Sequence, residues 1–307
     1  MRKKNYSIIL SLLLLTFLIV GGCGTINQVS NKNASSNNKL QIVTTFYPMY
    51  EFTKNIVKDK ANIELLIPSN VEPHDWEPTP KDVGKIQKAD IFVFNSKYFE
   101  TWVPSIKNSV SNENLSFVEA SSDIHLMNGD GHHQFDPHVW LNPVLAQQEV
   151  KTITKALIKA DPENKEFYQK NSDAYVAKLA KLDHQYRETL KDAKKKEIIT
   201  QHTAFGYLAK EYGMKQIPIA GLSPSQEPSP ARLGELKEFA VKHHVKVIYF
   251  EELASPKVAE TLAKEIGAKT EVLHTLEGLS KEEQDKGMNY ISVMQKNLDA
   301  IKKSLFD

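Results

Sequence analysis

Three histidines that follow predicted β-strands are the residues with the clearest capacity for chemistry. His74 lies in the loop after the second short apolar run, His138 lies after the fourth, and His202 directly follows the fifth. Ligands of open α/β sheets bind outside the carboxyl ends of the strands, so side chains in these loops can converge on one site. Three imidazoles with one carboxylate would suit Zn²⁺, which favours four ligands in a tetrahedron.

Three carboxylates at strand ends are candidates for the fourth ligand. Glu251 and Glu252 follow the seventh apolar run, and Glu277 lies just past the eighth. Glu251 or Glu252 could equally cap or solvate its own loop. We interpret the remaining histidines outside the loop before His138 as structural, namely His184, His243, His244 and His274.

Short β-branched runs that alternate with amphipathic stretches must position these side chains. Four candidate strands lie in each half of the chain, and helical patterns separate most of them. This alternation predicts α/β units with mainly parallel sheets. We find no residue-level repeat between the halves. The strands are expected at 41–45, 63–67, 91–95, 116–119, 197–200, 216–219, 245–250 and 270–273.

A long helical stretch separates the two halves. Residues 143–160 predict one helix, and residues 163–196 predict a second that contains neither glycine nor proline. A helix of about 30 residues is about 45 Å long, so it would join the halves rigidly. We therefore expect an N-terminal lobe at 40–162, a linking helix at 163–196 and a C-terminal lobe at 197–307.

Composition narrows the classes of function. The chain of 307 residues has 39 basic and 38 acidic side chains, so we expect no nucleic-acid partner. Its one cysteine, Cys23, leaves the folded part with no disulfide and no thiolate metal site. Any metal must therefore be held by His, Asp or Glu.

The first 40 residues predict secretion and anchoring. Basic residues 2–4 precede an apolar run at 8–20, which is typical of a signal peptide at 1–22. Gly21-Gly22-Cys23 resembles a bacterial lipobox, in which the cysteine is lipidated; an ordinary signal peptide and an uncleaved anchor are the alternatives. The polar residues 23–39 predict a flexible tether, as in a Gram-positive protein anchored to the outer face of the cell membrane.

Three motifs together resemble one protein family. From about Leu40 to the C-terminus, the chain is similar to the zinc-binding solute-binding lipoproteins of ABC importers (ZnuA/AdcA-like), which have manganese-binding relatives. The resemblance implies two α/β lobes, one long rigid helix between them, and a metal in the cleft. The motifs are Glu72-Pro73-His74-Asp75-Trp76-Glu77-Pro78, Asp136-Pro137-His138-Val139-Trp140-Leu141 and His202-Thr203-Ala204-Phe205-Gly206-Tyr207.

The resemblance also implies a ligand set and a function. Carried over by motif, His74, His138 and His202 are the first three ligands. Glu277 maps most naturally to the fourth, a position where family members differ and where water is the alternative. The implied protein is not an enzyme. It is a monomer that captures Zn²⁺ and delivers it to a membrane permease with a cytoplasmic ATPase.

The residue at position 202 distinguishes between metals. Manganese-binding relatives carry a carboxylate where this chain has His202. Imidazole suits zinc, whereas carboxylate and water suit Mn²⁺. Zinc is therefore the expected ion, and a manganese importer component is the alternative within the class.

A short loop before His138 carries His125, His132 and His133. Zinc-binding members of the family often have a longer loop here that is rich in histidine and acidic residues. The loop could collect zinc weakly and feed the cleft. Alternatively, its histidines are simply solvated.

Two functions from other classes remain open. A surface zinc hydrolase needs an open coordination position and a general base, and Asp75 or Glu77 could be that base if Glu277 is not a ligand. However, the chain has no His-Glu-x-x-His helix and no Gly-x-Ser-x-Gly elbow. The other function is that of an adhesin or sensor in which zinc is only structural.

Overall fold

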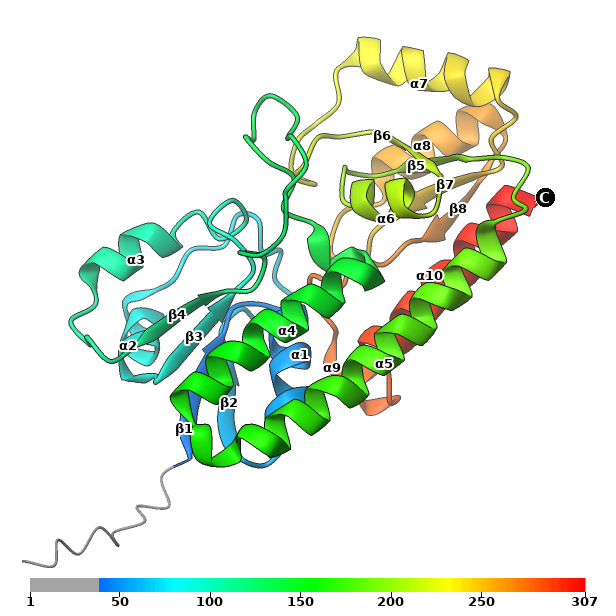
Figure 1. Ribbon diagram of the computed structural model, residues 1–307. Coiled ribbons are helices and arrows are strands. Elements are labelled where there is room, and N and C mark those ends of the chain that lie inside the picture. Colours follow the sequence, from blue (N-terminus) through cyan, green and yellow to red (C-terminus); the bar gives the residue numbers. More distant parts are fainter. Residues whose placement is uncertain (1–38, 307) are drawn as a thin grey trace, which may run out of the picture. The chain divides into compact units, whose positions relative to one another are not determined.

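Two parallel four-stranded sheets, one in each half of the chain, frame the fold (Figure 1). The computed structural model describes residues 39–306. The predicted signal peptide, Cys23 and the tether up to residue 38 lie outside the described residues. None of the helices within 39–306 has the length and apolar character needed to cross a membrane.

Both sheets have the same strand order, which confirms the predicted fold class. The orders are β2-β1-β3-β4 and β6-β5-β7-β8, and every pair is parallel. β3 is buried along its whole length, as expected for a parallel strand covered on both faces. The bounds are β1 Leu40–Thr44, β2 Ala61–Leu65, β3 Ile91–Phe94, β4 Ser116–Glu119, β5 Glu197–Thr200, β6 Lys215–Pro218, β7 Val247–Phe250 and β8 Lys269–Val272.

Small polar caps and prolines begin several helices. The side chains and backbones of Thr79 and Asp82 form a capping box at the start of α2. Asn142 Oδ1 accepts a hydrogen bond from the backbone N–H of Val144 at 2.8 Å and so caps α4. The helices are α1 Tyr47–Val57, α2 Pro80–Lys88, α3 Val103–Ser109, α4 Pro143–Ala160, α5 Lys165–Leu190, α6 Gly206–Glu211, α7 Pro230–Lys242, α8 Lys257–Ile266, α9 Lys281–Asp285 and α10 Tyr290–Phe306, with 3-10 turns η1 Val139–Leu141 and η2 Pro162–Asn164.

One short segment occurs twice, which corrects the expectation that the halves share no repeat. Residues 77–84 read EPTPKDVG, and residues 227–234 read EPSPARLG. Each segment follows the second strand of its half and leads into a helix that Thr79 or Ser229 caps. The two halves therefore match in topology and also, at this one point, in sequence.

The helical connection between the halves is shorter than predicted. α5 has 26 residues and ends at Leu190, so it is about 39 Å long, and residues 162–164 form a 3-10 turn. The sequence contains no breaker at this end. The helix stops because β5 begins at Glu197, and the backbone needs the intervening residues to turn into the sheet.

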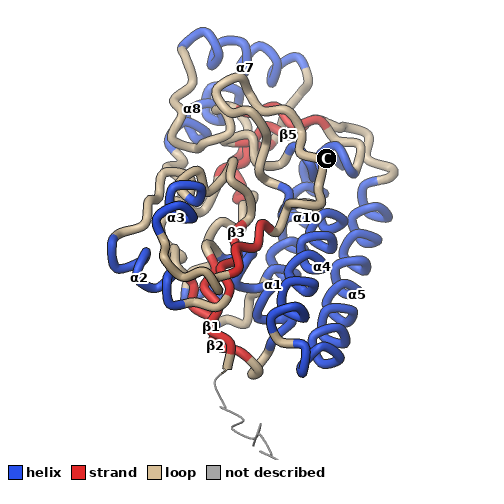
Figure 2. The backbone as a smooth tube through the Cα atoms, turned by 60° about the vertical axis from the view of Figure 1, so that its left-hand side comes forward, coloured by secondary structure: helices blue, strands red, loops and turns tan. Residues whose placement is uncertain are grey.

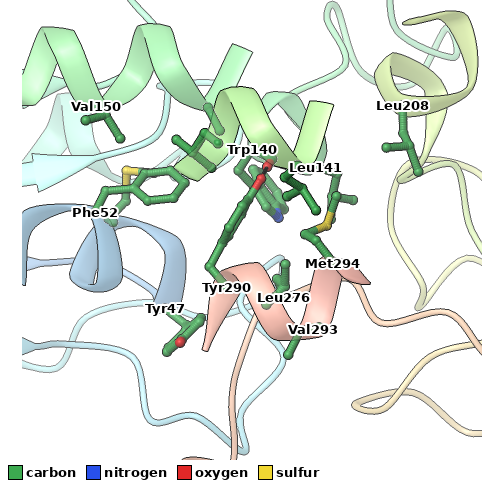
Figure 3. Close-up of a cluster of buried hydrophobic side chains, with 14 of the residues drawn as sticks. Tyr47, Phe52, Trp140, Leu141, Val150, Leu208, Leu276, Tyr290, Val293 and Met294 are labelled. Carbon is green, nitrogen blue, oxygen red and sulfur yellow. Dashed lines mark hydrogen bonds between the residues drawn. The ribbon is translucent and has the colours of Figure 1, made fainter. Parts of the chain in front are cut away.

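The C-terminal helix α10, which belongs to the predicted C-terminal lobe at 197–307, also contacts the first half of the chain. α5 and α10 lie side by side (Figures 1 and 2), and Tyr186 Oη donates a hydrogen bond to the carbonyl of Met294 at 2.7 Å. Figure 3 shows Tyr290 between Phe52 and Trp140. The Phe52 and Tyr290 rings pack edge to face at 5.1 Å. One continuous core therefore holds both sheets in a single compact unit.

Candidate metal centre

The four predicted ligand residues converge on one point between the two sheets. Nε2 of His138 lies 3.3 Å from Nε2 of His74 and 3.3 Å from Nε2 of His202. Glu277 Oε1 lies 3.3, 3.7 and 3.8 Å from the Nε2 atoms of His74, His138 and His202, respectively. Within residues 39–306 this is the one group of His, Cys, Asp or Glu side chains arranged to hold a metal ion.

These separations match the edges of a zinc tetrahedron. Zinc bonds of about 2.0–2.1 Å to nitrogen or oxygen place the ligand atoms about 3.3–3.4 Å apart. Three of the separations are 3.3 Å, and both longer ones involve Glu277 Oε1. A shift of a few tenths of an ångström in the Glu277 carboxylate would bring these two separations to the same length as the other three.

Asp136 orients the ring of His138, which lies fully buried between β4 and η1. Asp136 Oδ1 accepts the backbone N–H of His138 at 3.0 Å and lies 2.8 Å from its Nδ1. When Nδ1–H donates to this carboxylate, the lone pair on Nε2 points into the site. The buried Trp140 anchors the segment, since its Nε1–H donates to the carbonyl of Thr275 at 2.8 Å.

Glu251 orients His202 in the same way from the other sheet. Its Oε1 accepts the backbone N–H of His202 at 3.1 Å and also contacts Nδ1 of the ring. Glu251 is therefore neither a ligand nor a loop cap. The sequence hinted at the role of Asp136, because Asp-Pro-His keeps acid and imidazole close. The sequence contains no comparable sign for Glu251, because Glu251 follows β7 whereas His202 follows β5.

His74 and Glu277 come from loops that touch each other. Glu72 Oε1 accepts the backbone N–H of His74 at 3.0 Å. A Cβ on Gly278 would lie 2.1 Å from the carbonyl oxygen of Ser69, so only glycine allows this approach. Glu277 is 2% exposed, and its Oε2 has no hydrogen-bond partner among the described residues. A buried carboxylate oxygen of this kind fits a bound cation.

Burial sets the protonation of the site. It lowers the pKa of His74 to about 4, with a further contribution from His202, and it also lowers the pKa of His138 and of His202. The imidazoles are therefore neutral at pH 7, which is the form that binds metal. Burial also raises the pKa of Glu277 to about 8, with the charge of Glu251 adding to the shift.

The loop before His138 is called the auxiliary loop from here on. Its three histidines, His125, His132 and His133, do not come together. His125 and His132 are exposed, and His125 lines a cavity beside Tyr207 that is separate from the metal site. His133 lines a small cavity of about 60 Å³ that His74 also lines. Only His133 therefore adjoins the site.

The fold and the site define the class of the protein: it is a two-lobed α/β protein with four convergent side chains for a divalent metal ion between its lobes. Residues 42–304 match the profile of the family described as "Zinc-uptake complex component A periplasmic", and the chain belongs to this family.

Named relatives agree with this membership. The chain is 63% identical over 302 residues to the high-affinity zinc uptake system protein ZnuA of Bacillus subtilis, and the match covers 94% of each chain. It is 46% identical to the zinc-binding lipoprotein AdcA of Streptococcus pneumoniae, covering 94% of this chain and 60% of that longer protein. The crystal structure of the Zn(II)-bound ZnuA-like domain of AdcA superposes with a TM-score of 0.79, at 50% identity over 88% of this chain and all of that domain.

Proposed function

We propose that this chain captures Zn²⁺ outside the cytoplasm and delivers it to the permease of an ABC importer that a cytoplasmic ATPase drives. The observation that carries the proposal is the buried set His74, His138, His202 and Glu277, with its tetrahedral spacing. The names of the relatives, which refer to zinc uptake and zinc binding, support it.

Zinc fits the donor set better than manganese does. Three neutral imidazole nitrogens face one carboxylate, and nitrogen-rich tetrahedral sites suit zinc, whereas Mn²⁺ prefers oxygen ligands in an octahedron. Asp136 and Glu251 each lie within hydrogen-bond distance of Nδ1 in one of the rings, and an acceptor at that position increases the basicity of the ligating nitrogen. The manganese alternative is therefore not favoured.

Binding fits the site better than hydrolysis does. A catalytic zinc keeps one position open for water, whereas here four protein side chains each offer a ligand atom to the same point. Both halves of the site come from one chain, which supports a monomer as the working form.

Metal analysis and metal competition test this function. The protein purified without added metal should contain about one tightly bound zinc per chain. His202→Glu exchanges a nitrogen donor for a carboxylate, so it should shift the Zn²⁺/Mn²⁺ preference towards manganese by about tenfold, or about 1.4 kcal/mol. His243→Ala, which changes a half-buried histidine elsewhere, should behave as wild type. An unchanged preference in His202→Glu would place His202 outside the first coordination shell.

The membrane anchor is a second, separate part of the proposal. We place a lipid on Cys23, because a charged head, an apolar run and Gly21-Gly22 precede this cysteine. Cys23→Ser should release the protein into the medium without a change in zinc affinity, since the site lies in residues 39–306. A Cys23→Ser protein that stays on the membrane after cell fractionation would contradict the assignment.

A further inference from the structure

His274 contributes several of the hydrogen bonds that attach the segment carrying Glu277 to its surroundings. The backbone N–H of His274 donates to Asn297 Oδ1 at 2.9 Å, and Asn297 Nδ2 donates back to the His274 carbonyl at 2.8 Å. This reciprocal pair ties the segment to α10, the helix that contacts both halves. His274 itself is 6% exposed and makes none of the contacts in the metal site.

The ring of His274 faces two competing partners. Its Nδ1 lies 2.8 Å from Glu252 Oε1 and 2.9 Å from the backbone nitrogen of Leu276. One ring nitrogen cannot donate to the carboxylate and accept from the N–H at the same time. Burial lowers the pKa of His274, but the charge of Glu252 and hydrogen bonds to Glu252 and Glu283 outweigh it and raise this pKa to about 9. At pH 7 the ring is therefore a cation that donates to Glu252.

Glu252 extends this attachment towards Glu277. The Glu252 carboxylate also accepts the backbone N–H of Thr275 at 3.2 Å and the Thr275 hydroxyl at 3.0 Å. Leu276, the next residue, has a positive φ of 59°, which is unfavourable for a branched side chain. The backbone just before Glu277 thus holds a costly conformation that its neighbours must maintain.

The far side of this attachment is open to the surface. His274 Nε2 points towards Glu283, with 3.5 Å between Nε2 and Oε1, and both residues line a cavity of about 380 Å³ with Lys286 and Lys296. None of the four metal-site residues lines this cavity. The surface that faces His274 in this cavity is therefore separate from the three histidine ligands.

We propose that His274 is a positioning residue, which holds the 274–278 segment so that the Glu277 carboxylate stays in the zinc site. The inference rests on the proposed function, since it presupposes that Glu277 binds the metal. His274 acts only through the segment, so its loss should have the same effect as the loss of the Glu277 ligand. The three imidazoles should be unaffected.

A double-variant experiment on zinc dissociation tests this inference. Zinc-loaded protein is mixed with an excess of a colorimetric chelator, and the rate of zinc loss is followed. His274→Ala should speed the loss about tenfold or more, as is typical when a partner behind the ligands is removed. Glu277→Gln should speed the loss of zinc at least as much.

The double variant should match Glu277→Gln within about twofold, because both changes remove the same interaction, that of the Glu277 carboxylate with the metal. His243→Ala, whose ring lies 3.7 Å from Glu197 on the surface, is the matched control and should leave the rate unchanged.

Cobalt spectra separate positioning from a general loss of stability. Co²⁺ in place of zinc should give His274→Ala the visible spectrum of Glu277→Gln, because the carboxylate has left the metal. A wild-type spectrum, an unchanged dissociation rate, or rate effects that multiply in the double variant would each overturn the inference.

A second variant covers the case in which His274→Ala does not fold. Glu252→Gln keeps the shape of the side chain and removes the charge that faces His274, so it too must speed zinc loss; an unchanged rate would count against the inference. The proposed function is tested separately by the wild-type protein. If that protein fails to bind about one zinc tightly, the function fails whatever the variants do.

Discussion

The His138–His202 half of the metal site differs in construction from the His74–Glu277 half. Each half takes one residue from each lobe, so the difference does not lie between the lobes. His138 and His202 are fully buried. Asp136 contacts both the backbone N–H and Nδ1 of His138, and Glu251 contacts the same two groups of His202. His74 has only a backbone contact of this kind, to Glu72, and Glu277 follows the strained residue Leu276.

We infer from this difference that the His138–His202 half holds zinc and that the His74–Glu277 half releases it. Oriented imidazoles lose little entropy when the metal binds, so the His138–His202 half should supply a preformed base for zinc. The other half is made of two loops that touch at Gly278 and Ser69, and in it a carboxylate contacts only the backbone of His74. A transport protein needs both properties, since its site must fill tightly and still be emptied.

Removal of a ligand should have the largest effect and should differ between the halves. His138→Ala and His202→Ala should each weaken zinc binding by more than about a hundredfold, because each also leaves a buried carboxyl group without its imidazole partner. His74→Ala should cost less, since no carboxylate is left behind its ring. The thermal stabilisation by zinc measures this, because ligand binding stabilises the fold by about 4 kcal/mol at a thousandfold excess over Kd. His184→Ala should behave as wild type, and equal losses at His74 and His138 would remove the distinction.

Changes behind the rings should rank next. Asp136→Asn and Glu251→Gln keep the side-chain shape but weaken the acceptor for Nδ1–H, so each should reduce zinc affinity about 10–100-fold. Glu72→Gln should have a smaller effect, because Glu72 contacts only the backbone of His74. Calorimetric titration in a competing chelator gives the affinities. A Glu72 effect as large as that of Asp136 would mean that both halves are supported alike.

Much of the fold could be predicted because its causes are local. Apolar β-branched runs predicted all eight strands to within two residues at each end. The end of α5 at Leu190 could not be predicted, because it depends on where β5 must enter its sheet. The crossing of α10 to the first half was also missed, since its contacts to Trp140 and Phe52 join residues more than a hundred positions apart.

The convergence of the four candidate ligands could be predicted from the sequence, but the groups that support them could not. Position after a strand and the three family motifs indicated the histidines and Glu277. The choice of Glu277 over Glu251 followed from the resemblance alone, because both carboxylates follow strands. The roles of Glu251 and His274 depend on side-chain contacts across strands and loops, which no spacing in the sequence reveals.

The pH dependence of zinc binding should come from buried carboxyl groups, because burial raises the pKa of Glu277 and of Glu251 to about 8 and that of Asp136 to about 7. The metal-free Glu277 carboxyl has a pKa of about 8, raised by burial, so it is largely protonated at pH 7 and zinc must displace its proton. The imidazoles have lowered pKa values and are already neutral there, so they release none. Zinc affinity should therefore rise by about fivefold as the pH increases from 7 to 8, because the deprotonated fraction of Glu277 rises by about that factor when its pKa is about 8. Calorimetry in buffers of different ionisation enthalpy counts the protons, and Glu277→Gln should release about one fewer than wild type. The same count in both proteins would place the titrating group elsewhere.

The smallest expected effect concerns access to the His74 side. His133 lines the small cavity next to His74, whereas His125 lines a different cavity and His132 is exposed. If the auxiliary loop collects zinc, His133 is the residue placed to pass it on. His133→Ala should slow zinc association by about threefold at low zinc, because a weak ligand in the cavity next to His74 raises the local metal concentration. The equilibrium affinity should stay within about twofold, since His133 is not among the four ligands. Stopped-flow mixing with limiting zinc measures the rate, and His125→Ala is the matched control because it removes a loop histidine that lines a different cavity. If His125→Ala and His133→Ala slow association equally, the loop attracts zinc only by its general composition. If neither does, its histidines are simply solvated and zinc reaches His74 without them.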